Sequence, residues 1–219
     1  MKKILIVLGI LSISYTMAFS QKPIRYRLDE MLASGKLEAN PGHKAVVFND
    51  GKKKGITFTG IIWIKDLEFS EGTIETDLRG RNEFLKSFVG IVFNTADTSM
   101  YEDILFRPFN FRHQDPVRRT WSLAYTSEPD FPYTKLRKEN TGQFESEILP
   151  NPVPEDWTHA RIVITKDSVQ VFVNHMEKPS LTVKRLGNYH GNQLGLLVYG
   201  NDTPGEFANL VITPANKKN

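Results

Sequence analysis

Gly72-Thr73-Ile74-Glu75-Thr76-Asp77-Leu78-Arg79 is the stretch of this 219-residue sequence that best indicates the fold class. The apolar residues Ile74 and Leu78 alternate with polar residues at positions 73, 75, 77 and 79. Successive side chains of a β-strand point to opposite faces, so a period of two predicts a strand with one buried face and one polar face.

Similar short runs continue along the chain and are separated by turn-forming residues. Further strands are predicted at 57–59, 61–64, 88–93, 104–107, 121–125, 160–164, 169–173, 193–199 and 208–212. The only helix expected is a turn or two from Leu28 to Ala33, ended by Gly35. Strands and helices do not alternate as a parallel sheet would require, so the sequence predicts an all-β fold, a two-sheet antiparallel β-sandwich.

The absence of cysteine narrows the possible chemistry. It excludes a disulfide-stapled module, a thiol-dependent enzyme and any cysteine-ligated zinc or iron–sulfur site. Length and a hydrophobic content of 40% favour a single domain over residues 21–219, without a linker or repeat. The stretch from Pro150 to Pro154 is too short to divide domains, and we expect it to carry the chain between the two sheets.

Residues 1–20 are typical of a secretory signal peptide. Two lysines precede a mostly apolar run from Ile4 to Ala18, and small residues at positions 18 and 20 suit cleavage before Gln21. An uncleaved anchor helix is the alternative, but the run is shorter than the roughly 20 residues that span a bilayer. No cysteine is present to carry a lipid. We therefore expect a secreted or periplasmic protein with no membrane span after cleavage.

The net charge argues against nucleic acid as a partner. The whole chain has a formal charge of +3, and removal of the two leader lysines leaves 26 basic and 25 acidic side chains. A nearly neutral protein lacks the basic excess that phosphate backbones attract. Neutral or weakly acidic sugars are the partners that this balance favours.

Several of these segments together point to one superfamily. They are Phe69–Leu78, Ser87–Asn94, Tyr101 to Phe111, Trp157–Arg161 with Val171–Asn174, and Gly205–Leu210. They resemble successive strands of the concanavalin A-like lectin/glucanase jelly roll, and more narrowly the bacterial secreted branch labelled as a 3-keto-disaccharide hydrolase or family-16-like domain. The likeness covers about residues 45–213. The superfamily includes lectins, laminin-G-like modules and glycosidases, so the fold does not fix the function.

The resemblance also supplies a candidate catalytic pair. Family-16 glycosidases carry a strand motif Glu-x-Asp-x-Glu, or a variant one residue longer, and Glu75 and Asp77 match its first two positions. The second catalytic glutamate is replaced by Arg79, and Gly80 follows. Two residues of strand rise would separate Glu75 from Asp77 by about 6.6 Å, within the range of a carboxylate pair. Alternatively, both carboxylates pair with neighbouring arginines on a polar face.

A second group of residues has the properties of a sugar-binding site. An arginine fork and an asparagine amide can bond vicinal hydroxyls or a carboxylate, and an aromatic ring can stack on a pyranose. The predicted ligand-binding residues are Arg107, Asn110, Tyr125, Tyr133 and Arg137. They come from a strand end and the loops after it, where binding groups often lie. Alternatively they form a structural network, with Arg107 as the buried partner of a glutamate.

Metal chemistry is weakly indicated. None of the five histidines has a partner at metal-ligand spacing, so zinc is not expected. Asn201, Asp202 and Glu206 offer oxygen atoms for a structural calcium ion, but their spacing matches no fixed calcium loop. No cofactor is otherwise indicated.

Three functions are compatible with these features. The leading hypothesis is a secreted jelly-roll protein that binds a glycan on the concave face of a sheet. The alternatives are a glycoside hydrolase acting on a disaccharide, 3-keto-glycoside or glucan, and a non-catalytic protein-interaction module. An open groove on the concave face would favour glycan binding, whereas a face plugged by the loop 112–120 would favour the interaction module.

Overall fold

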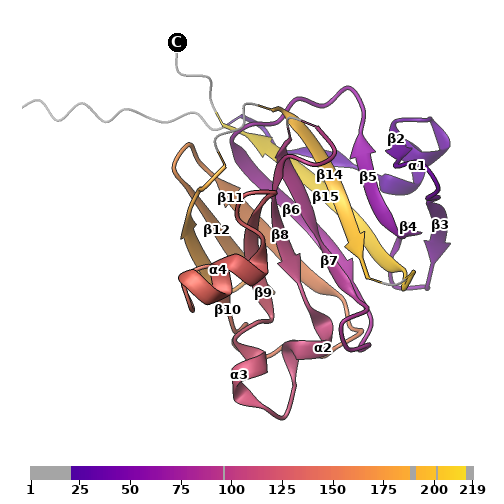
Figure 1. Ribbon diagram of the computed structural model, residues 1–219. Coiled ribbons are helices and arrows are strands. Elements are labelled where there is room, and N and C mark those ends of the chain that lie inside the picture. The colour runs from indigo at the N-terminus through magenta and orange to yellow at the C-terminus, as the bar shows by residue number, and fades with distance from the viewer. Residues whose placement is uncertain (1–20, 96, 188–190, 201, 216–219) are drawn as a thin grey trace, which may run out of the picture.

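The computed structural model describes residues 21–95, 97–187, 191–200 and 202–215, which form two packed antiparallel β-sheets (Figure 1). The eight-stranded sheet has the order β13 (Leu181–Lys184), β12 (Ser168–Val173), β11 (Thr158–Ile164), β6 (Gly72–Arg79), β15 (Gly205–Pro214), β4 (Lys54–Phe58) and β3 (Val46–Asn49), and β1 (Ile24–Tyr26) also pairs with β15. The seven-stranded sheet has the order β10 (Glu145–Ser146), β9 (Leu123–Glu128), β8 (Tyr101–Phe106), β7 (Phe88–Thr95), β14 (Gln193–Tyr199), β5 (Gly60–Ile64) and β2 (Leu37–Ala39). The predicted all-β sandwich is confirmed.

In the described part of the chain, four short helices accompany the sheets: α1 (Leu28–Ala33), α2 (Pro108–Phe111), α3 (Pro116–Arg119) and α4 (Tyr133–Glu139). The expectation of a single helix, over α1, is therefore wrong. The other three helices have four to seven residues, too few for a helical hydrophobic period to stand out in the sequence. The predicted signal peptide lies outside the described residues. Within the described ranges, no helix has the length and apolar character needed to cross a membrane.

Strand β6 occupies a central position in the eight-stranded sheet. It pairs with β11 on one side and with β15 on the other. Ile74 and Leu78 are completely buried between the sheets, whereas Glu75 and Asp77 point to the outer face. The alternation in the sequence therefore gives the orientation of this strand correctly.

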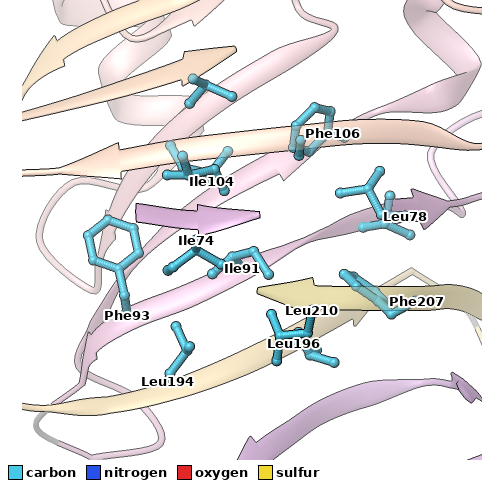
Figure 2. Packing of buried hydrophobic residues seen from close by; sticks show 14 of the residues in the cluster. Ile74, Leu78, Ile91, Phe93, Ile104, Phe106, Leu194, Leu196, Phe207 and Leu210 are labelled. Carbon is cyan, nitrogen blue, oxygen red and sulfur yellow. The ribbon is translucent and has the colours of Figure 1, made fainter. Parts of the chain in front are cut away.

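The main core lies between the two sheets. Figure 2 shows its centre, where side chains from both sheets interdigitate. Its labelled members come from β6, β7, β8, β14 and β15: Ile74, Leu78, Ile91, Phe93, Ile104, Phe106, Leu194, Leu196, Phe207 and Leu210. Each is fully buried. Complete burial of such a side chain is worth about 1.5–3 kcal/mol, so the packing of the two sheets against each other is the main source of stability in a chain without disulfides.

The β10–β11 and β4–β5 connections are two of several that carry the chain between the sheets. Residues 147–157, which include the proline-rich stretch, connect β10 in one sheet to β11 in the other, as expected. Gly60 links β4 to β5 at a φ of +83°, a conformation that favours glycine. A Cβ atom at this position would approach the His43 ring to 2.6 Å. Glycine therefore allows the chain to turn the corner beside His43.

The outer face of the seven-stranded sheet is also apolar, which is unusual for a surface facing away from the main core. Seven buried residues form a second hydrophobic cluster there: Ile61, Phe88, Val92, Leu105, Phe109, Ala124 and Leu197. Trp63 and Tyr101 pack against it and are only partly buried. This face therefore combines an apolar floor with aromatic rings that reach the surface.

Candidate functional site

The residues predicted from the sequence to act together lie in three separate places. Glu75 and Asp77 are on the outer face of the eight-stranded sheet. Arg107, Asn110, Tyr133 and Arg137 gather near the β9–β10 edge of the seven-stranded sheet. Tyr125 points into the core between the sheets. A single ligand cannot contact all of them, because the thickness of the sandwich separates the two outer faces.

Asp77 is enclosed by three hydrogen-bond donors. Its Oδ1 lies 2.8 Å from His159 Nδ1, and its Oδ2 accepts from Lys53 Nζ and Asn209 Nδ2, each at 2.6 Å. Burial raises the pKa of this carboxyl, but the three donors outweigh burial and hold the pKa at about 2. His159 Nε2 lies 3.5 Å from Glu75 Oε2. Asp77 therefore stays ionised at neutral pH and is unsuited to donate a proton as a general acid.

Arg79 takes the place of the missing glutamate and is part of an ion-pair network. It pairs with Glu206 and lies 3.0 Å from Asp50. Its guanidinium also lies 4.5 Å from the centre of the Trp157 ring. Arg81 Nη2 donates to Glu206 at 3.0 Å. In each of these contacts the charged group of Arg79 or Glu206 is bound by another side chain of the protein.

Two of the predicted calcium residues, Asp202 and Glu206, have different surroundings. Glu206 lies in this network on the eight-stranded sheet, whereas Asp202 lines a cleft on the seven-stranded sheet. Asn201 lies outside the described residues. In the described part of the chain, no group of three histidine, aspartate or glutamate residues is arranged to hold a metal ion. Glu206 is paired with Arg79 and Arg81, and a calcium site formed by Asn201, Asp202 and Glu206 stays a prediction.

The arginines of the second predicted group share one buried carboxylate. Arg107, 2% exposed, donates to Glu145 Oε1 at 2.7 Å and to the Trp121 carbonyl at 2.8 Å. Arg137 donates to both oxygens of Glu145, at 2.5 and 2.7 Å. The Tyr133 ring centre lies 4.9 Å from the Arg107 guanidinium and 5.4 Å from that of Arg137. The group ties α4 and the end of β8 to β10 through Glu145, a residue that the sequence did not single out.

Some polar atoms beside this group have no partner among the described residues. Asn110 Nδ2 donates to the Trp121 carbonyl at 3.3 Å, but its Oδ1 is buried and unpaired. Arg107 Nη2 and Ser122 Oγ are buried and unpaired as well. Burial lowers the pKa of Arg107, and the charge of Glu145 opposes that shift.

Tyr125 belongs to a different network. Its ring is completely buried, its hydroxyl donates to Glu102, and the Leu186 backbone N–H donates to that hydroxyl at 2.8 Å. Arg185 and Asn94 also donate to Glu102, each at 2.5 Å. The expectation that Tyr125 contacts a ligand does not fit this position. Its direction follows from the alternation along β9, where Ala124 points outward and Tyr125 inward.

The outer face of the seven-stranded sheet carries a cleft of about 500 Å³. Ile61 and Leu197 form part of its floor, and Tyr101 and Tyr199 line it with aromatic rings. Tyr199 is 67% exposed. Polar side chains complete the lining: Asn40, His43, Thr59 and Asp202. Its lining residues come from several strands and loops, so no local sequence motif marks it.

Two of the polar groups in this cleft are held in place by neighbours. Asn40 Oδ1 accepts a hydrogen bond from Trp63 Nε1 at 2.7 Å, which fixes the orientation of the Asn40 side-chain amide. His43 Nδ1 lies 3.0 Å from the Thr59 hydroxyl. Fixed polar groups beside an apolar floor are the usual composition of a small-molecule site.

A buried carboxyl lies on the same face. Asp103 is 3% exposed and accepts a hydrogen bond from Thr126 Oγ1 at 2.8 Å. Burial raises the pKa of Asp103 to about 7, and the nearby charge of Glu128 acts in the same direction. Burial also raises the pKa of Glu128 and of Tyr101. The described carboxyl with the strongest upward shift is thus Asp103, and not a member of the Glu75 and Asp77 pair.

Solved structures share this fold at low sequence identity. A Bacillus subtilis protein of unknown function with a galectin-like fold is 10% identical, with 89% of this chain and 96% of that chain covered and a TM-score of 0.57. The carbohydrate-binding module CBM66 from Bacillus subtilis is 11% identical, with coverage of 78% and 95% and a TM-score of 0.52. Domain 4 of AbnA, an extracellular arabinanase from Geobacillus stearothermophilus solved with arabinotriose, is 13% identical, with coverage of 90% and 94% and a TM-score of 0.51.

These likenesses show the fold alone. They confirm a galectin-like or concanavalin A-like β-sandwich, the class of fold that the sequence predicts. The sequence matches no protein-family model, and no curated protein sequence matches it. The function therefore has to be argued from the residues of this chain.

Proposed function

We propose that this protein is a secreted glycan-binding protein and that the sugar lies in the cleft on the outer face of the seven-stranded sheet. The observation that carries this proposal is the combination of the exposed Tyr199 ring with an apolar floor and fixed polar side chains in one cleft. Several structural neighbours are carbohydrate-binding or carbohydrate-active proteins, which supports the same class of ligand.

The chemistry of the cleft suits a sugar ring. A pyranose or furanose has an apolar face that can lie on Tyr199, while Tyr101 lines the same cleft. Its hydroxyls can donate to the Asp202 carboxylate and can accept from the Asn40 amide. One cleft thus offers both stacking and hydrogen bonding, which fix the orientation of a ligand.

In this proposal the Arg107 group supports the binding face without contacting the sugar. Arg107 and Arg137 are already bonded to Glu145, and breaking a buried ion pair by removing one partner is costly. Tyr133 and Asn110 lie beside them. Their role is to hold α4 and the strand ends in place.

Hydrolysis through Glu75 and Asp77 has weaker support. A glycosidase needs one protonated and one ionised carboxyl. Asp77 is held ionised by its three donors, and the second glutamate of the motif is Arg79. The finer assignment to the 3-keto-disaccharide hydrolase branch remains a proposal based on sequence resemblance alone.

Secretion is part of the proposal. It is supported by the predicted signal peptide and by a structural neighbour described as extracellular. N-terminal sequencing of the protein exported by its native host would test it directly. We expect the mature chain to begin at Gln21, and an intact Met1 on the exported protein would contradict the predicted cleavage.

Calorimetric titration of the mature chain with a panel of neutral oligosaccharides, arabinotriose included, tests the binding site. We expect at least one ligand to bind, and Tyr199→Ala to weaken it about tenfold, since stacking on an aromatic ring is worth about 1–2 kcal/mol. Phe172→Ala is the matched control, because Phe172 lies on the other sheet and stacks with Arg161 at 3.7 Å. Equal binding by the Tyr199 variant would exclude this cleft.

A further inference from the structure

The segment 112–120, which follows α2 and includes α3, lies at one end of the sandwich (Figure 1). A hollow of about 350 Å³ is present there, lined by Arg112, His113, Arg119 and Asn151. This lining contains two arginines and a histidine but no carboxylate. The hollow thus differs from the sugar cleft, whose lining contains aromatic rings and Asp202.

Protein contacts hold both guanidinium groups and leave one end of each free. Arg112 donates through Nε and Nη2 to the Asn151 carbonyl, both at 3.3 Å. Arg119 donates through Nε to Glu147 at 2.8 Å and through Nη1 to the His113 carbonyl at 3.0 Å. Within the described residues, Arg112 Nη1 and Arg119 Nη2 have no partner. Two guanidinium NH2 groups, one from each arginine, therefore remain available as donors.

His113 adds a third donor. Its Nδ1 accepts a hydrogen bond from the Asp115 backbone N–H at 3.1 Å. A nitrogen that accepts cannot carry the proton of a neutral imidazole, so the proton is on Nε2. His113 therefore presents an N–H group that complements the two arginines.

Two acidic side chains beside the hollow, Asp115 and Glu147, already have partners. Asp115 Oδ1 accepts from the Val117 N–H at 2.9 Å, which caps α3. Glu147 Oε1 accepts from Arg119 and, at 2.9 Å, from Asn151 Nδ2. Neither carboxylate occupies the free ends of the donors. A site with several free donors, whose neighbouring carboxylates already bind protein groups, is suited to an anion.

A row of aromatic rings connects this end of the molecule with the sugar cleft. The centres of successive rings are 5.9 Å apart from Tyr199 to Phe88, 5.3 Å from Phe88 to Phe109, and 5.6 Å from Phe109 to Phe84. Arg118, within the segment 112–120, lies 4.4 Å above the Phe84 ring. Phe84 is 49% exposed. Phe88 and Phe109 are each 5% exposed, so the rings of this row that an extended ligand could contact are Tyr199 and Phe84, at its two ends.

We propose that the hollow of Arg112, His113 and Arg119 binds an anionic group of an acidic glycan, another part of which occupies the cleft at Tyr199. The anionic group is a carboxylate or a sulfate ester, because both offer two or more oxygen atoms to a guanidinium fork. This inference rests on the proposed glycan-binding function and names the class of glycan.

Paired titrations test the inference. The wild-type chain is titrated with a neutral oligosaccharide, an oligogalacturonate, which carries only carboxylates, and a sulfated galactan oligosaccharide, which carries only sulfate esters. We expect at least one acidic ligand to bind about tenfold more tightly than the neutral one, the gain that one or two charge-assisted hydrogen bonds provide. The acidic ligand that binds more tightly identifies the anionic group. Raising the salt concentration should reduce this advantage, because screening weakens exposed charge interactions.

Two variants locate the effect. Arg112→Ala and His113→Ala should each remove most of the advantage of the acidic ligand and leave the neutral ligand unchanged. Arg161→Ala is the matched control, since it removes the same charge from the outer face of the eight-stranded sheet. Circular dichroism and thermal unfolding of each variant confirm that it folds.

The outcomes separate the two proposals. If the neutral ligand binds, Tyr199→Ala weakens it and neither acidic ligand has an advantage, the proposed function stands and the basic hollow is excluded as an anion site. An advantage that Arg161→Ala removes as strongly as Arg112→Ala reflects net charge alone and overturns the inference. If no glycan of any kind binds, both proposals are wrong.

Discussion

Replacement of Asp103 by Asn should make the protein more stable at pH 8, and the gain should decrease as the pH falls. Asp103 is 3% exposed on the outer face of the seven-stranded sheet, where its pKa is raised from 3.8 to about 7. In the unfolded chain the carboxyl ionises near its ordinary pKa. Between these two values the native state holds a proton that the unfolded state has lost, so native stability declines as the pH rises.

The size of the effect follows from the shift. A difference of about three pKa units corresponds to about 4 kcal/mol of destabilisation above pH 8, at 1.36 kcal/mol for each unit. At pH 5 only about 1–2 kcal/mol of this cost is present, since the native carboxyl is still protonated. Asparagine has no charge to bury and its oxygen can still accept from Thr126. The stability difference between variant and wild type should therefore change by about 2–3 kcal/mol between pH 5 and pH 8.

Urea unfolding followed by circular dichroism at pH 5, 6, 7 and 8 measures this difference. Asp156→Asn is the control, because Asp156 is exposed and its replacement should give the same small effect at every pH. A difference for Asp103→Asn that does not change with pH would show that the carboxyl is not held protonated in the native state. The reasoning about burial on this face would then be wrong.

Three further changes test other parts of the structure. Asp77→Asn should lower the free energy of unfolding by about 1–2 kcal/mol at pH 7. This loss should disappear as the pH falls from 4 towards 2, because the contribution of a carboxyl with a depressed pKa is lost on protonation. A loss that persists at pH 2 in urea titrations would contradict this. Gly90→Ala should destabilise the protein by about 2 kcal/mol or more in thermal or urea unfolding, since its Cβ would lie 2.0 Å from the Ile104 carbonyl oxygen. An unfolding midpoint of the variant equal to that of wild type would show that β7 and β8 can move apart to accommodate the methyl group. Tyr125→Phe should cost about 1–3 kcal/mol by leaving Glu102 and the Leu186 N–H short of a partner, and a neutral result in the same assay would argue against this network.

The fold could be predicted from local patterns, because β6 and its neighbours alternate in the sequence as they do in the structure. The period of two places Ile74 inside and Glu75 outside, and both positions are confirmed. The short helix α4 was missed, because a single buried residue, Leu136, gives no helical period.

The site was harder to predict, since it depends on contacts between distant segments. Arg107 and Arg137 were correctly placed together, but their shared partner Glu145 was not identified. Tyr125 was grouped with them although it lies on the opposite face of the same sheet. Which face of β9 points inward is set by pairing with β8, and such pairing is not encoded in any short motif.

The seven-stranded sheet gave another unexpected result. Its strands contain long apolar runs because apolar side chains point to both faces, one set into the main core and the other into the second hydrophobic cluster. Runs of this kind predict a strand, but they do not indicate which of its two faces carries functional residues. The cleft between Tyr101 and Tyr199 depends on the order β8, β7, β14, β5 of neighbouring strands in the folded sheet.

The most direct test of the central proposal is titration of one neutral oligosaccharide that binds the mature chain into wild type, Tyr199→Ala and Phe172→Ala. We predict about a tenfold rise in the dissociation constant for Tyr199→Ala and no change for Phe172→Ala. Unchanged binding by Tyr199→Ala, or an equal loss in both variants, would contradict a glycan site on the outer face of the seven-stranded sheet.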